Sequence, residues 1–70
     1  MINPIKADIG RNVTYMGNYV NNGKPEWGVV TSFNDDYVFV QYEGESNSKA
    51  TKREDLIWGR YNLAHGLPNT

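Results

Sequence analysis

The chain has 70 residues, no cysteine, a single histidine and a formal net charge of −1. This length corresponds to one domain, near the lower limit of what folds without help. Without cysteine there is neither a disulfide nor a thiolate metal site, and the histidine, His65, has no carboxylates near it in sequence to complete another kind of metal site. The near-neutral charge argues against a dedicated non-specific nucleic-acid binder, which carries a basic excess.

The chain also lacks the sequence features of a membrane or secreted protein. No apolar run approaches the roughly 20 residues that a membrane span needs. The N-terminus, MINPIKADIG, has neither the basic start nor the apolar stretch of a signal peptide. We therefore expect a cytoplasmic protein, and the lack of cysteine fits that reducing compartment.

The first half of the chain predicts three strands. Residues 1–9 form an N-terminal lead-in that Ile9 is expected to fix to the core. Arg11 to Met16 alternates apolar and polar side chains, which is typical of a strand. Gly17 to Glu26 is a long loop, rich in asparagine and glycine. Trp27 to Phe33 and Tyr37 to Tyr42 are the strongest strand signals, and the polar turn 34–36 between them predicts a hairpin.

The faces of this hairpin differ. Val38, Val40 and Tyr42 are expected to face the core, because this face is the more uniformly apolar, and Tyr37, Phe39 and Gln41 to face away. Gly28 lies where a strongly bent strand has no room for a side chain.

The second half predicts a short strand, a turn and a closing strand. Lys49 to Thr51 is the fourth strand. Lys52 to Asp55 is a single helical or 3-10 turn, with Thr51 as its N-cap and Glu54 at capping-box spacing. Leu56 to Trp58 closes the domain, which spans residues 10–59, and residues 60–70 form a tail that is at most partly ordered.

This plan resembles the SH3-like barrel topology that Tudor and KOW domains share. The stretches GVVTSFNDDYVFVQYEG (28–44) and SKATKREDLIW (48–58) also resemble small uncharacterised proteins of bacteriophages and prophages. The resemblance implies an all-β fold, a small five-stranded barrel with a one-turn 3-10 helix before the last strand, and a mobile-element origin. It implies no activity, because no residues match the aromatic cage of methyl-lysine-reading Tudor domains.

Catalysis is not expected. The acidic pairs Asp35-Asp36 and Glu54-Asp55 are explained by a hairpin turn and by the start of a helical turn, where acids are favoured. The chain has no serine or threonine beside a histidine base, no P-loop and no glycine fingerprint. We predict a protein without catalytic residues, cofactor or metal.

Two surfaces are candidates for binding. Nine aromatic residues exceed what so small a core needs, so Trp27, Tyr37 and Phe39, with the acidic Asp35 and Asp36, are candidates for a protein-binding surface. The alternative is that Trp27 or Phe39 packs beneath the long loop or the tail. The basic residues Lys49, Lys52, Arg53 and Arg60 are candidates for nucleic-acid contacts, with a solvated sheet edge as the alternative.

The leading hypothesis is a non-catalytic interaction module, encoded by a phage or prophage, that binds a host or phage protein. Inhibition of a host process such as CRISPR defence is one concrete form, because the acidic residues 35–45 suit the blocking of a basic surface. A nucleic-acid-binding KOW-like barrel and a self-associating structural barrel remain the alternatives.

Overall fold

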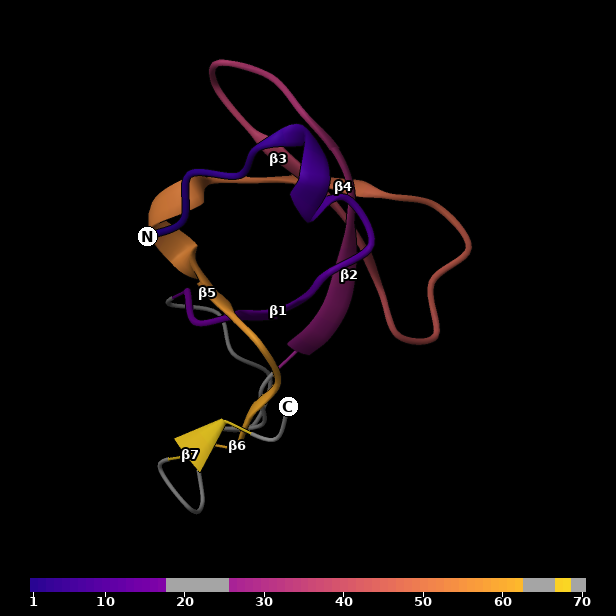
Figure 1. Ribbon diagram of the computed structural model, residues 1–70. Coiled ribbons are helices and arrows are strands. Elements are labelled where there is room, and N and C mark those ends of the chain that lie inside the picture. The colour runs from indigo at the N-terminus through magenta and orange to yellow at the C-terminus, as the bar shows by residue number, and fades with distance from the viewer. Residues whose placement is uncertain (18–25, 63–66, 69–70) are drawn as a thin grey trace.

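The structure is a computed structural model that describes residues 1–17, 26–62 and 67–68. Five strands form one antiparallel sheet in the order β4-β3-β2-β1-β5 (Figure 1). The strands are β1 (Asn12–Tyr15), β2 (Glu26–Phe33), β3 (Val38–Tyr42), β4 (Lys49–Thr51) and β5 (Leu56–Trp58). Two 3-10 turns, η1 (Lys6–Asp8) and η3 (Arg53–Asp55), precede β1 and β5. The predicted all-β class and the 3-10 turn before the last strand are confirmed.

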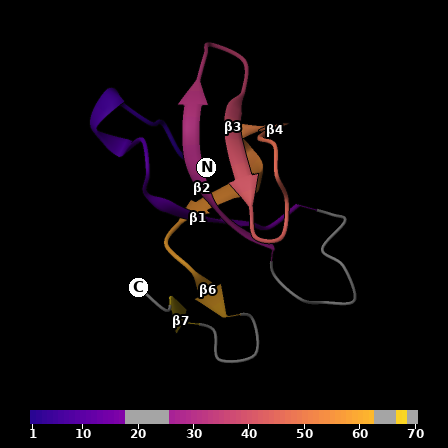
Figure 2. The ribbon, with the colours of Figure 1, turned by 90° about the vertical axis from the view of Figure 1, so that its right-hand side faces the viewer.

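A second, two-stranded ladder follows the sheet. It pairs β6 (Tyr61–Asn62) with β7 (Leu67–Pro68) and lies at the end of the molecule opposite the tip of the β2–β3 hairpin (Figure 2). Within the described ranges, none of the helical segments has the length and apolar character needed to cross a membrane.

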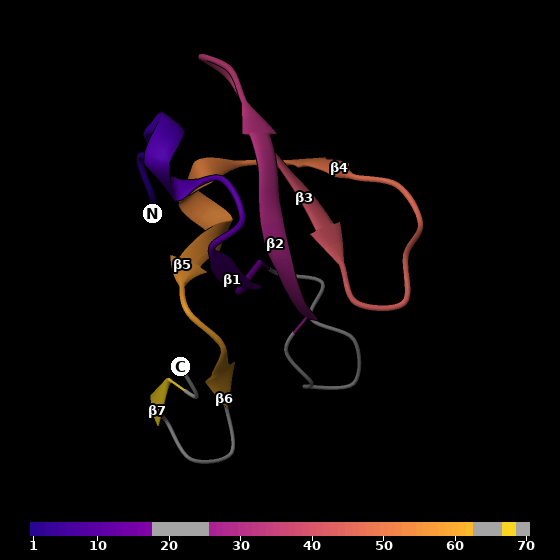
Figure 3. The same ribbon diagram turned by 45° about the vertical axis from the view of Figure 1, so that its right-hand side comes forward.

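The β2–β3 hairpin forms where the sequence predicts it. Strand β2 runs between β1 and β3 as the longest strand of the sheet (Figure 3). The side chain of Asn34 closes the turn, because its Oδ1 accepts hydrogen bonds from the backbone N–H groups of Asp36 and Tyr37 at 2.9 and 2.8 Å. This is the local bonding that favours asparagine in turns.

The core lies on the face of the hairpin that carries the valines. Val38 and Val40 are fully buried and Tyr42 is 8% exposed, which confirms the predicted assignment of this face. The rest of the cluster comes from β1, β2, β5 and the N-terminal segment: Ile2, Val13, Val30 and Leu56, with Tyr15, Phe33 and Trp58 packed against it. A continuous apolar cluster of this kind is what stabilises a domain without disulfides.

The N-terminal segment contacts this core through a residue other than the predicted one. Ile9 is 48% exposed, so the expectation that it fixes the segment was wrong. Ile2 is only 2% exposed, and its backbone N–H donates to the carbonyl of Arg53 at 3.1 Å. Two backbone bonds attach the segment to the sheet and its preceding turn, from the N–H of Ile2 to Arg53 and from the N–H of Gly10 to Val30, and of Ile2 and Ile9 only Ile2 meets the core.

The predicted N-cap of the turn before β5 was also wrong. Lys52 is the N-cap residue of η3, and no side chain makes a capping hydrogen bond there. Thr51 belongs to β4 and is 7% exposed, and its hydroxyl lies 2.8 Å from the hydroxyl of Tyr42. The hydroxyl of Thr51 therefore bonds to buried Tyr42 and does not cap the turn.

Candidate protein-binding groove

An open groove of about 810 Å³ runs between β4 with its following turn and the adjoining ends of β1 and β2. Its lining combines three tyrosines with charged side chains: Tyr15, Tyr37, Tyr42, Glu26, Glu54, Asp55, Lys49 and Lys52, together with Ala50 and Thr51. A smaller hollow of about 390 Å³ shares Tyr37, Lys52 and Glu54 with the groove and adds Asp36 from the hairpin turn. Tyr37 therefore joins the groove to the acidic hairpin tip.

The tyrosines form the apolar wall of this groove. The rings of Tyr15 and Tyr42 meet edge to face, with centroids 6.4 Å apart and an interplanar angle of 84°. This is the arrangement that aromatic pairs favour. Tyr37 is 41% exposed and is the most exposed large aromatic among the described residues.

The hydroxyl of Tyr42 in the groove lining has a raised pKa. Burial raises the pKa of the Tyr42 hydroxyl, the hydrogen bond with Thr51 lowers it, and the nearby carboxylates of Glu26 and Asp55 raise it. Negative groups oppose the loss of a proton from a neighbouring hydroxyl. The two carboxylates thus act on the same point in the groove from different segments of the chain.

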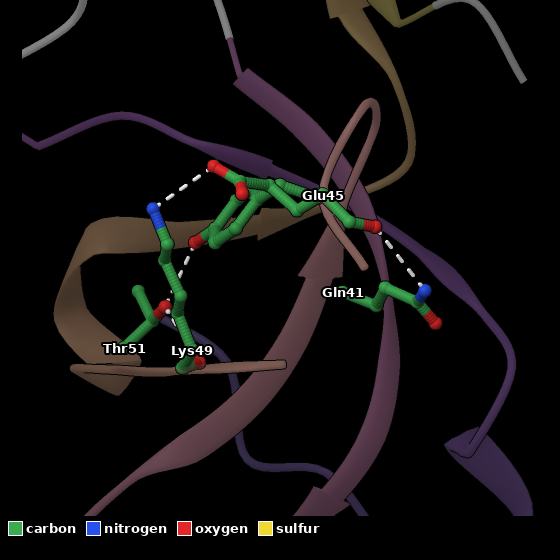
Figure 4. A network of polar contacts seen from close by, with 5 residues as sticks. Gln41, Glu45, Lys49 and Thr51 are labelled. Atoms are coloured by element: carbon green, nitrogen blue, oxygen red, sulfur yellow. Dashed lines mark hydrogen bonds and ion pairs between the residues drawn. The ribbon is translucent and has the colours of Figure 1, made fainter. Parts of the chain in front are cut away.

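Lys49, at the rim, is already held by an acid outside the groove. Its ammonium group lies 3.0 Å from Oε1 of Glu45, and the amide of Gln41 donates to the backbone carbonyl of Glu45 at 3.3 Å (Figure 4). The hydrogen bond to Glu45 raises the pKa of Lys49. The charge of Lys49 is therefore offset before any ligand arrives.

Trp27 lies on the opposite face of the sheet, against the tail. Its indole N–H donates to the carbonyl of Tyr61 at 3.0 Å, and the guanidinium of Arg60 lies 4.3 Å from the ring centroid. Arg60 also forms an ion pair with Glu43. Because of these contacts Trp27 is half-buried, and its polar atom has a partner inside the chain.

Phe39 lies on the same outer face as Trp27 but at its other end. It pairs with Ser32 in β2 and with Ala50 in β4, and it is half-buried. Ser32 comes five positions after Trp27 in β2, which is about 16 Å along a strand. The structure therefore does not bring the three aromatic candidates into one patch, and it places only Tyr37 at the groove.

The acidic candidates Asp35 and Asp36 are exposed in the hairpin turn. The guanidinium of Arg53 donates hydrogen bonds to the backbone carbonyls of Asn34 and Asp35, which ties η3 to this turn. The two carboxylates are left directed to solvent beside Tyr37.

The four basic candidates do not form a common surface for phosphates. Lys49 pairs with Glu45, Arg60 pairs with Glu43, and Arg53 bonds to backbone carbonyls. Lys52, at the groove rim, is the one of the four for which the described part of the chain offers neither an ion pair nor a side-chain hydrogen bond.

Glu26 and Tyr15 are groove residues that the sequence pattern did not mark as binding residues. Antiparallel pairing of β1 with β2 sets Tyr15 opposite Glu26, and pairing of β1 with β5 sets Tyr15 opposite Leu56, next to Asp55. Register is set by contacts across the sheet. The sequence alone therefore gave no direct indication that Tyr15, Glu26 and Asp55 line one groove.

Within the ranges that the structure describes, no three histidine, cysteine, aspartate or glutamate side chains come together as a metal site. His65 lies outside the described residues. No protein-family model, curated protein or solved structure matches the chain.

Proposed function

We propose that this chain is a non-catalytic protein-binding module that docks its partner in the tyrosine-lined groove and on the adjacent hairpin tip. The observation that carries the proposal is the position of Tyr37. Its exposed ring joins an 810 Å³ groove to a turn with two exposed carboxylates. A rigid aromatic side chain at the edge of a concave surface is typical of the anchors in protein interfaces.

The likeness to SH3-like phage and prophage proteins supports a partner from the phage or from its host, with a host defence protein as one form. Nucleic acid is the less favoured ligand. Three of the four basic candidates are engaged inside the chain, whereas phosphate binding needs cations that are available to the ligand.

Site-specific photocrosslinking in the cells that make the protein tests this proposal. A photoreactive phenylalanine analogue replaces Tyr37 in one variant and Ser32, which is exposed on the outer face of β2, in a control variant. We expect nuclease-resistant, protease-sensitive adducts at position 37 and few at position 32. Adducts at position 32 alone, or adducts that nuclease removes, would contradict the proposal.

A further inference from the structure

We propose that the groove receives an arginine-bearing segment of the protein partner. This inference rests on the proposed function and names the chemistry of its ligand. The observation behind it is the way in which the acidic residues divide into two groups.

The acids away from the groove are each paired with a base. Asp8 lies 2.9 Å from Arg11, Glu45 lies 3.0 Å from Lys49, and Glu43 pairs with Arg60. The remaining acids are Glu26, Asp35, Asp36, Glu54 and Asp55. Among the described residues, none of these five side chains forms an ion pair, and all five line the groove, line the adjoining hollow or lie in the hairpin turn.

Glu26, Glu54 and Asp55, which form no ion pair among the described residues, line the same groove as the tyrosines, and this combination favours a cationic ligand. A guanidinium stacks on the face of a tyrosine ring and forms two parallel hydrogen bonds with one carboxylate. Lysine offers a single, more strongly hydrated point charge, so arginine uses such a site better. The chain itself shows the stacking chemistry, with Arg11 and Arg60 placed 4.1 and 4.3 Å from the ring centroids of Trp58 and Trp27.

The same charges disfavour an anionic ligand. A phosphate or acidic peptide in the groove would meet the carboxylates of Glu26, Glu54 and Asp55, against one lysine that Glu45 already holds and one, Lys52, at the rim. Like charges brought together without water between them are unfavourable. Lys52 also repels a cationic ligand, so removing its charge should strengthen the binding of such a ligand, whereas removing a carboxylate should weaken it.

The test uses fluorescein-labelled heptapeptides in which arginine, lysine or glutamate alternates with alanine. Fluorescence anisotropy at about 20 mM and about 300 mM salt measures their binding to the full chain. Interactions between exposed charges are screened much more strongly at the higher salt concentration. We expect the affinity order arginine, lysine, glutamate, with the difference shrinking at high salt. Equal affinity for the arginine and glutamate peptides would overturn the inference.

Three variants locate the binding. Removing one exposed charge contact changes affinity by a few-fold, so Glu26→Gln should weaken the arginine peptide by about threefold. Lys52→Gln should strengthen it by about two- to threefold for the same reason. Glu43→Gln removes an identical charge outside the groove and should change it by less than about twofold. An equal loss in Glu26→Gln and Glu43→Gln, or weaker binding by Lys52→Gln, would place the peptide elsewhere.

The two proposals fail separately. Protein adducts at position 37 together with no preference for the arginine peptide would remove the ligand assignment and leave the protein-binding function. Absence of protein adducts at position 37 would remove the proposed function itself.

Discussion

Thr14 joins the sheet to the C-terminal segment, and its replacement by valine is the sharpest test of how this fold is held together. The side chain is fully buried in β1. Its hydroxyl donates to the carbonyl of Gly59 at 2.7 Å and accepts from the N–H of Tyr61 at 2.8 Å. Thr14→Val keeps the branched shape at Cβ and removes both bonds.

Each hydrogen bond contributes about 0.5–1.5 kcal/mol net, and a buried partner left unsatisfied costs more, so two lost bonds should lower the free energy of unfolding by about 2 kcal/mol. For a domain of this size that corresponds to a fall in melting temperature of roughly 8–16 °C. Thermal unfolding followed by circular dichroism measures the shift.

Hydrogen exchange separates the lost bonds from a general loss of stability. In Thr14→Val the amide of Tyr61 should exchange faster than the drop in global stability accounts for, because its acceptor is gone. Thr14→Ser is the matched control, since it keeps the hydroxyl and should keep this amide protected. An unchanged melting temperature, or equal exchange of the Tyr61 amide in both variants, would refute the reasoning.

The remaining predictions concern backbone packing and pH. Gly28→Ala should lower the free energy of unfolding by about 3 kcal/mol or more, because its Cβ would lie 2.5 Å from the carbonyl oxygen of Gln41. Gly44→Ala is the matched control: Gly44 has φ +82° and open space around it, so the loss should be only about 1 kcal/mol. Denaturant titration of both variants measures the difference. The raised pKa of Tyr42 means that the folded state holds this proton more tightly than the unfolded state, so its contribution is complete below pH 10.0 and is lost as pH rises through the folded-state pKa. In Tyr42→Phe the free energy of unfolding should fall less steeply with pH above pH 10.0 than in the original chain. An unchanged slope of that free energy against pH would contradict this prediction.

Much of the fold could be predicted from local patterns. The bounds of β4 and β5 agree with the prediction, and β2 and β3 differ from it by one residue at one end. Alternation sets which face of a strand is buried, and the chain obeys it from Val38 to Tyr42. Gly28 was expected where a bent strand has no room for a side chain, and the short distances from its ideal Cβ to β3 agree with the lack of room.

The errors came from contacts between segments far apart in sequence. Ile2 and Ile9 are both aliphatic residues of a segment without a clear period, and only the bond from Ile2 to Arg53 decides which of them is buried. Thr51 fitted a capping box locally, but a tyrosine nine residues earlier in the chain binds its hydroxyl. Local spacing cannot rank such alternatives, because the competing partner is brought in by the sheet.

The candidate groove shows the same limit. Asp35 and Asp36 could be selected because they lie in a polar turn, and Tyr37 because alternation directs it away from the core; the structure places Tyr37 beside Asp36. For Trp27 the sequence left open both an exposed position and packing beneath the tail, and the contacts of its indole with Arg60 and Tyr61 show the second. Glu26 and Asp55 became groove residues through strand pairing, which no short motif records.

Surface stability does not explain why, among the described residues, three acids form ion pairs and five do not. An exposed ion pair contributes about 0–1 kcal/mol, so pairing the remaining acids would add little to the folding free energy, and leaving them unpaired costs little. Their position matters for association instead, because carboxylates that line one groove can orient an approaching partner of the opposite charge. Lys49, Lys52 and Arg53 line the same groove and the adjoining hollow, so the acidity is local to individual carboxylates and does not extend over a whole face of this chain of net charge −1. Under the proposed function, a basic partner would meet these carboxylates beside the exposed ring of Tyr37.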